Sequence, residues 1–192
     1  MTRITGATRI AAALLIGSSV LVLSFARPAT AQIVPLERNG IDFSIAALSA
    51  APVWSVGFSH VITPALDIAA FYSYQSVGGT TAGLLDVGVR YHFPVIPPGA
   101  DVWLSGGLAN ASSFTGFGSA TGFSVGAGAS LRLTPALAGY AAGSLIALSG
   151  TSNAVIDAGL MLQLAPRVSG QLGYVTFAGN GGPYLGINLA IP

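Results

Sequence analysis

Residues 123–133 read Phe-Ser-Val-Gly-Ala-Gly-Ala-Ser-Leu-Arg-Leu, and their alternation decides the fold class. Every odd-numbered position is apolar, and every even-numbered position is small or polar. Successive side chains of a β-strand point to opposite faces, so this period of two predicts a strand with one apolar face and one polar face. The same alternation runs from Leu85 to Phe93, where Asp86, Arg90 and His92 fall on the polar side.

Ten segments of this kind follow one another along the chain. Strands of roughly ten residues with this period are typical of a membrane barrel that faces lipid outside and a polar lumen inside. An open sheet would leave unpaired backbone groups in hydrocarbon, so we expect an all-β fold, a closed antiparallel transmembrane β-barrel of ten strands. Closure at eight strands stays an alternative, because the first and last boundaries are the weakest. The predicted strands are Ile41–Leu48, Val53–Ile62, Leu66–Val77, Leu84–Phe93, Asp101–Ala111, Phe123–Leu133, Ala138–Leu148, Ala154–Leu164, Val168–Phe177 and Tyr184–Ile191.

The connections between these segments sort by type. All four connections that follow an even-numbered strand are proline-containing turns: Thr63–Ala65, Pro94–Ala100, Thr134–Ala136 and Ala165–Arg167. The others consist mostly of Gly, Ser, Thr and Asn, apart from the first, Ser49–Pro52. If the first strand starts in the periplasm, the proline turns are all periplasmic and the glycine-rich loops are all extracellular.

The bulk composition agrees with a surface that faces lipid. Charged residues make up 7% of the 192 residues and hydrophobic residues 52%, whereas soluble domains carry roughly 25% charged residues. The nearest approach to a membrane helix after residue 31 is Leu133–Leu148, which contains a proline and two glycines, so an inner-membrane helix pair is the minor alternative. Without its first 31 residues the chain has four arginines and six acids, a net charge of −2 (4 − 6), which gives no electrostatic basis for binding nucleic acid.

The N-terminal residues have the features of an export signal. Arg3 and Arg9 form a basic region, an apolar stretch follows, and Ala29-Thr30-Ala31 matches the small-residue cleavage motif. We therefore expect residues 1–31 to be a cleaved signal peptide, residues 32–39 a short lead-in and residues 40–192 the barrel. Such a protein is located in the outer membrane of a Gram-negative bacterium.

In these features the chain resembles the small bacterial outer-membrane β-barrel superfamily, which includes the outer-membrane protein A-like and opacity-type barrels. The resemblance covers residues 40–192 and rests on the signal segment, the alternating strands, the Thr-Pro-x-Leu turns at Thr63 and Thr134, and the last strand. It implies outer-membrane lipids and the barrel-assembly machinery as partners. Barrels of this superfamily usually end in an aromatic residue, whereas this chain ends in Ile191-Pro192.

Charged residues of the predicted strands share the polar face and form the candidate site. A charge that faces lipid near the membrane midplane costs about 2–4 kcal/mol for arginine, so we expect these residues in the lumen. There they either form ion pairs that hold the wall together or line a narrow conduit. Counting residues from the turns places Asp101 beside Arg132, as an ion pair, and Asp67 near His92. The candidate lumen charges are Asp42, Asp67, Asp86, Arg90, Asp101, Arg132 and Asp157.

Aromatic residues are expected both in belts at the two membrane interfaces and in the lumen. The belt residues are Trp54, Tyr72 and Tyr74 on the extracellular side and His60, Tyr91, Phe93 and Tyr140 on the periplasmic side. Large side chains that fall on the lumen side and could plug the barrel are Phe71, Trp103, Met161 and Phe177. The remaining lumen positions are mostly Gly and Ser, which would leave a thin passage.

No catalytic, metal-binding or cofactor-binding residues are expected. Outer-membrane hydrolases need a histidine with serine or aspartate near the lipid interface or the outer rim, and both histidines map to the periplasmic end. Cysteine is absent, which excludes thiolate metal sites and a cysteine nucleophile.

We therefore expect a barrel that is not an enzyme and has a structural or surface-interaction role. A narrow porin-like diffusion pore is the alternative, in which Asp86 and Asp157 near the outer mouth would favour cations. A lipid-modifying enzyme of the outer membrane is the least supported hypothesis.

Overall fold

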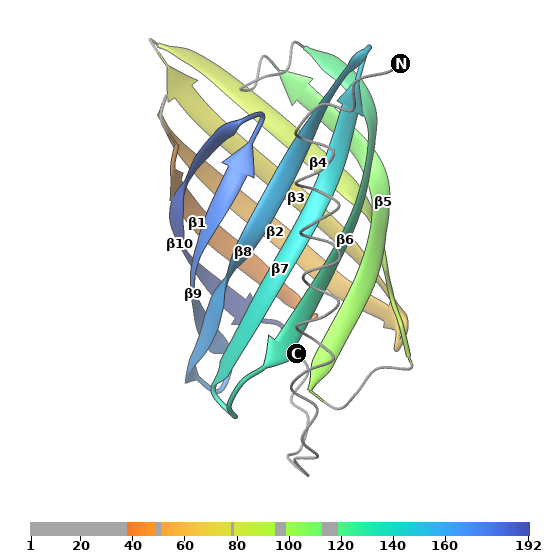
Figure 1. Cartoon of the computed structure of the whole chain (residues 1–192), viewed down its shortest axis with the longest axis vertical. Coiled ribbons are helices and arrows are strands. Elements are labelled where there is room, and N and C mark those ends of the chain that lie inside the picture. Colours follow the sequence, from red (N-terminus) through yellow and green to blue (C-terminus); the bar gives the residue numbers. More distant parts are fainter. Residues whose placement is uncertain (1–37, 49–50, 78, 95–98, 113–118) are drawn as a thin grey trace, which may run out of the picture. The chain divides into compact units, whose positions relative to one another are not determined.

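The computed structural model describes residues 38–48, 51–77, 79–94, 99–112 and 119–192. The expected signal peptide, residues 1–31, and most of the lead-in lie outside them. Within the described residues ten antiparallel strands close into a barrel (Figure 1). The ten-strand prediction is therefore confirmed and the eight-strand alternative is wrong.

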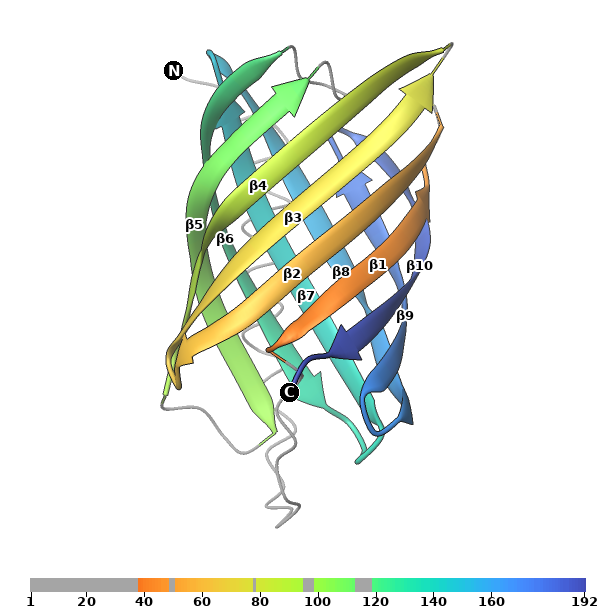
Figure 2. The same ribbon diagram turned by 180° about the vertical axis from the view of Figure 1, so that it is seen from behind.

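Each strand pairs with the next one along the chain, and β1 closes the barrel on β10 (Figure 2). The described part of the chain contains no helix that is long and apolar enough to cross a membrane, and most of the segment considered for a helix pair is strand β7. The strands are β1 Gly40–Ala47, β2 Pro52–Thr63, β3 Leu66–Val77, β4 Thr80–His92, β5 Ala100–Ser112, β6 Ala120–Arg132, β7 Leu137–Leu148, β8 Thr151–Ala165, β9 Val168–Phe177 and β10 Asn180–Ala190.

The predicted strand boundaries differ most where glycine-rich or polar segments extend a strand. β4 begins at Thr80 rather than Leu84, and β10 begins at Asn180 rather than Tyr184. These extensions do not alternate clearly in hydropathy, yet their backbones pair with the neighbouring strands. Backbone pairing needs no apolar side chain, so the alternation underestimates the strand length at these ends.

The two ends of the barrel have different turns. At one end the Thr134 hydroxyl accepts hydrogen bonds from the backbone N–H groups of Ala136 and Leu137, at 3.3 and 3.1 Å, and the Thr63 hydroxyl accepts one from Ala65 at 3.3 Å. This end also holds the start of β1 and the end of β10, and we call it the terminal end. At the other end, the loop end, the two-residue turns Ser149-Gly150 and Ala178-Gly179 have positive φ at both residues, as type I′ hairpin turns require.

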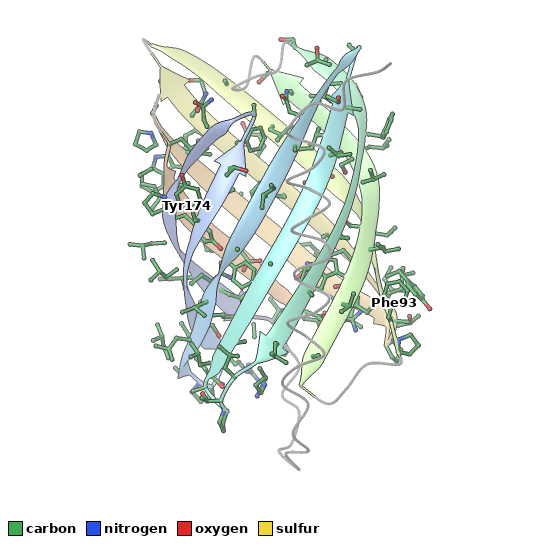
Figure 3. All side chains as sticks on the ribbon, in the orientation of Figure 1. Phe93 and Tyr174 are labelled. Carbon is green, nitrogen blue, oxygen red and sulfur yellow. The ribbon has the colours of Figure 1, made fainter. Side chains whose placement is uncertain are left out.

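The outer face of the barrel is apolar and exposed. Leu108, Leu185 and Leu172 are 70%, 61% and 56% exposed, a surface that lipid must cover. Tyr174 and Phe93 project from the outside of the barrel (Figure 3).

The outer aromatic residues include most of the expected belts. The exposed members are Trp54, Tyr72, Tyr74, Tyr91 and Phe93. His60 is also exposed and lies beside Phe58, with ring centroids 6.5 Å apart. The assignment of Tyr140 to a belt is wrong, because its side chain lines the inside of the barrel. In β7 the inward positions are Ala138, Tyr140 and Ala142, and the sequence alone offers no apolar contrast between those positions and their neighbours.

Candidate functional site in the barrel lumen

A network of charged residues occupies the terminal end of the lumen. Asp67, whose side chain is fully buried, accepts hydrogen bonds through Oδ1 from Arg38 at 3.3 Å and from His92 at 2.7 Å, and its Oδ2 forms an ion pair with Arg90 at 3.1 Å. Arg90 is the direct cross-strand partner of Asp67 in the β3–β4 pair. Arg38 precedes β1 and also donates to the Pro64 carbonyl oxygen at 2.6 Å, so it ties the lead-in to the β2–β3 turn.

His92 connects this network to β5. Its Nδ1 lies 2.8 and 2.9 Å from the two carboxylate oxygens of Asp101, and its Nε2 lies 2.7 Å from Asp67 Oδ1. Ionised carboxylates only accept hydrogen bonds, so this geometry favours a ring that carries a proton on each nitrogen and is positively charged. Three cationic groups therefore surround two carboxylates at this end of the barrel.

The expected closeness of Asp67 and His92 agrees with this geometry. The Asp101 carboxylate binds His92, and Arg132 Nη1 donates a hydrogen bond to the Pro135 carbonyl oxygen at 3.4 Å. The ion pair between Arg132 and Asp101 stays a prediction.

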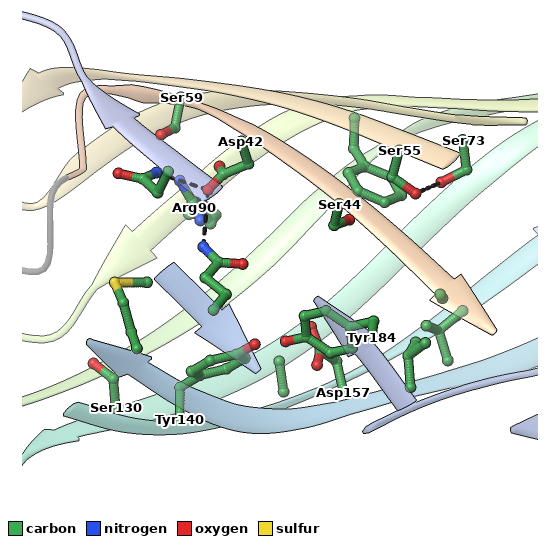
Figure 4. A pocket seen from close by; sticks show the side chains of 18 of the residues that line it. Asp42, Ser44, Ser55, Ser59, Ser73, Arg90, Ser130, Tyr140, Asp157 and Tyr184 are labelled. Atoms are coloured by element: carbon green, nitrogen blue, oxygen red, sulfur yellow. Dashed lines mark hydrogen bonds between the residues drawn. The ribbon is translucent and has the colours of Figure 1, made fainter. Parts of the chain in front are cut away.

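The other three lumen acids lie nearer the middle of the barrel. Asp42 Oδ1 accepts from Asn188 Nδ2 at 2.7 Å and from Gln171 Nε2 at 3.0 Å (Figure 4). Asp86 Oδ1 accepts from the Ser124 hydroxyl at 3.0 Å.

Asp157 completes this group. Its Oδ1 is buried and has no hydrogen-bond partner. Within the described residues no arginine or histidine forms an ion pair with Asp42, Asp86 or Asp157. The middle of the lumen therefore holds three carboxyl groups with which the terminal-end network forms no ion pair.

Two adjoining cavities occupy the lumen. The larger has a volume of about 410 Å³, and its lining runs from Arg38 and Asp101 at the terminal end to Leu48 and Phe177 at the loop end. The smaller, of about 300 Å³, is lined by Asp86, Ser105 and Ser124. The two share Phe71, Arg90, Trp103 and Asp157 among their lining residues. The inside of the barrel is therefore not filled by side chains in its middle portion.

The large lumen side chains do not fill this space, because they lie against glycines of the neighbouring strand. Trp103 is the cross-strand partner of Gly128, and Phe71 that of Gly57. A Cβ on Gly128 would collide with Trp103 Cζ2, and one on Gly57 would stand 3.7 Å from Phe71 Cδ2. Phe71 points inward yet is 41% exposed. These two residues line the passage and do not close it.

Apolar side chains pack together at the loop end of the lumen. Leu84 is 1% exposed, Leu148 2% and Ile146 4%. They form one cluster with Leu48, Val53 and Phe177, and the last three also line the larger cavity. The lumen is thus charged at the terminal end, acidic in the middle and apolar at the loop end.

Sequence reasoning missed several lumen residues, among them Asn188 and Gln171, which bind Asp42, and Arg38, Tyr140 and Tyr184. Arg38 lies before the first strand, where no alternation can assign a face. Tyr140 was assigned to a belt, and Tyr184 was used only as the start of the last strand. Tyr184 shares one face of its strand with Gly182 and Gly186, and the apolar residues Leu185 and Ile187 lie on the opposite face. The period of two could therefore have placed Tyr184 in the lumen.

Comparison with known proteins supports the fold. No protein-family model matches the chain, and no curated protein matches it significantly. Among solved structures, the KdgM porin matches with a TM-score of 0.52 at 10% identity, over 80% of this chain and 99% of the porin.

Two further structures are similar. The KdgM porin in complex with disordered oligogalacturonate matches with a TM-score of 0.52 at 12% identity, over 80% of this chain and 99% of that one. The N-terminal β-barrel domain of Pseudomonas aeruginosa OprF matches with a TM-score of 0.40 at 15% identity, over 78% of this chain and 94% of that domain. At these identities the KdgM likeness establishes the fold, a closed transmembrane β-barrel.

Proposed function

We propose that this chain is an outer-membrane protein that forms a narrow passive diffusion pore with a preference for cations. The observation that carries the proposal is the pair of adjoining lumen cavities, whose linings share Asp157 and reach from the charged terminal end to the apolar loop end. The closed barrel fold that the chain shares with the KdgM porin forms the wall of the pore. The pore function rests on the lumen of this chain.

The charge in the middle of the lumen supports the cation preference. Asp42, Asp86 and Asp157 face the cavities and have no cationic partner among the described residues. Acidic residues that line a pore attract cations and repel anions. Within the confined lumen this effect is stronger than in bulk water, because the surrounding wall has a low dielectric constant.

The apolar cluster at the loop end supports a small conductance. Its close-packed side chains, including Leu84, Leu148 and Ile146, narrow the lumen. Apolar constrictions restrict flow by excluding water. We therefore expect a pore that passes small ions and carries far less current than a wide porin.

A purely structural role is the second candidate, and the terminal-end network favours it. Asp67 binds Arg38 of the lead-in and Arg90 and His92 of β4. These contacts stabilise the barrel at its terminal end. An enzymatic role has less support. Both ring nitrogens of His92 already bind carboxylates, so His92 is not available to activate a serine hydroxyl.

Conductance in planar lipid bilayers tests the pore directly. We expect small, discrete current steps and a reversal potential that indicates a higher permeability for K⁺ than for Cl⁻. Replacing Asp86→Asn together with Asp157→Asn should bring the permeability ratio close to one, because it removes two of the three unpaired lumen charges. The absence of current steps from correctly folded protein would favour the structural role.

Cysteine labelling tests which side of β8 faces the lumen and whether the lumen opens to the outside. Asp157 lines the cavity, whereas Ala158 is exposed on the outer face. In intact cells a small cationic thiol reagent should modify an Asp157→Cys protein and leave an Ala158→Cys protein unmodified, since lipid covers position 158. Modification of position 158 alone would contradict the assigned faces, and no modification at position 157 would contradict an open lumen.

A further inference from the structure

Two tyrosines face each other across a pair of glycines inside the barrel. Tyr140 in β7 pairs with Gly159 in β8, Gly159 pairs with Gly173 in β9, and Gly173 pairs with Tyr184 in β10. A Cβ on Gly159 would stand 2.9 Å from the Tyr140 hydroxyl, and a Cβ on Gly173 would stand 2.6 Å from Tyr184 Cε1. The two side chains therefore lie over the glycines and line the larger cavity together.

The Tyr184 hydroxyl is unpartnered. Its side chain is only 7% exposed, and its oxygen has no hydrogen-bond partner. Buried hydroxyl groups are nearly always hydrogen-bonded, because leaving one unpaired costs free energy. Tyr184 lines the cavity (Figure 4), so a molecule that enters this space can supply the partner of its hydroxyl group.

Carboxylate oxygens without strong partners face the same cavity. Asp42 uses Oδ1 for both Asn188 and Gln171. A Cβ on Gly57 would stand 3.4 Å from Asp42 Oδ2 and 3.7 Å from Phe71 Cδ2, so the second oxygen of Asp42 and the edge of an aromatic ring lie over the same glycine. Asp157, with its unpaired Oδ1, is the next inward residue after Gly159 along β8.

From this juxtaposition we propose that the larger cavity binds a small organic cation, an ammonium group with a hydroxyl substituent. Asp42 and Asp157 supply the negative charge, Phe71 and Tyr184 line the cavity with aromatic rings, whose faces attract cations, and the Tyr184 hydroxyl donates to the oxygen of the ligand. The volume of about 410 Å³ falls in the range of small-molecule sites, about 300–1,000 Å³. The inference rests on the proposed function and names its substrate class.

The alternative occupant, a metal ion, fits the site less well. Metal sites gather three or more oxygen or nitrogen ligands around one point, and the described residues contain no group of three His, Cys, Asp or Glu side chains placed in that way. Aromatic faces contribute little to binding a hard metal ion, whereas they attract the diffuse charge of an alkylammonium group.

Calorimetric titration of the full-length protein in detergent micelles tests the site with choline as the probe. Choline should bind, and 3,3-dimethyl-1-butanol, its uncharged carbon analogue, should not bind. Replacing Asp42→Asn together with Asp157→Asn should weaken choline binding by at least about tenfold, since both counter-charges are lost. Sodium chloride, added at the same ionic strength as choline chloride, should not compete with choline for the site.

A matched pair of tyrosine variants separates the site from the outer surface. Tyr184→Phe removes the unpartnered hydroxyl and should weaken choline binding severalfold, whereas Tyr174→Phe removes an exposed hydroxyl on the lipid face and should leave binding unchanged. Near-ultraviolet circular dichroism should show native packing for each variant. Equal binding of the uncharged analogue, or binding that survives the aspartate substitutions, would overturn the inference.

The binding measurement and the bilayer measurement test the two proposals independently. A protein that conducts ions and does not bind choline overturns the organic-cation site and leaves the pore in place. A protein that binds choline and conducts no current overturns the pore and retains the site as a binding pocket.

Discussion

Asp67→Ala should lower the free energy of unfolding by about 3–5 kcal/mol, the usual loss when one partner of a buried ion pair is removed. Asp67 is fully buried and binds Arg38, Arg90 and His92. Without it, three positively charged groups remain close together, with Asp101 as the only other carboxylate in the network. The substitution thus leaves uncompensated charge inside the barrel and adds repulsion between like charges.

Asp86→Ala is the matched control for this prediction. It removes an acid from the same lumen, but Asp86 binds only the Ser124 hydroxyl among the described residues, so its removal strands no cation. We expect a loss of about 1 kcal/mol or a small gain. Reversible urea unfolding in detergent micelles or lipid vesicles measures both variants. Equal losses in the two variants would mean that the network does not stabilise the barrel.

The fold was predictable because membrane barrels impose a strict rule on every strand. Asp86 and Arg90 alternate with the apolar residues Leu85, Val87, Val89 and Tyr91, and lipid on one side leaves only one arrangement for such a segment. The sorting of proline turns and glycine-rich loops by parity supported ten strands over the eight-strand alternative. The predicted ends failed at residues 80–83 and 180–183, where small or polar residues pair through their backbones without any alternation.

The candidate site was predictable in its membership and less so in its contacts. The alternation placed Asp42 and Asp157 on the polar face, and both line the larger cavity. It could not assign partners, since a pairing depends on the register between strands and on residues before the first strand, such as Arg38. The orientation of the lumen rings was also beyond the sequence, because the alternation places Trp103 and Phe71 in the lumen and does not determine whether they close the passage.

The orientation of Trp103 leads to the second large effect, a loss of conductance in Gly128→Ala. A Cβ on Gly128 would collide with Trp103 Cζ2 and would stand 3.0 Å from Cη2, and both are side-chain atoms that can move. The backbone of β6 is held by pairing with β5 and β7, so the indole ring moves and the backbone stays. The ring is displaced away from Gly128, and we expect it to move toward the axis, into the cavities that it lines. We expect single-channel conductance to fall by more than about twofold, because a narrow passage is sensitive to any added side chain.

Two further variants make this prediction specific to the ring. Gly106→Ala adds the same methyl group in β5 on the outer face, where the nearest atom is the Ser124 carbonyl oxygen at 3.9 Å, and it should leave conductance unchanged. Trp103→Ala added to Gly128→Ala removes the displaced ring and should restore conductance to at least the level of the unmodified protein. If Gly128→Ala lowers only the stability of the barrel and leaves the current unchanged, Trp103 does not border the conducting path, and the ions pass on the β1–β10 side, between Asp42 and Tyr184.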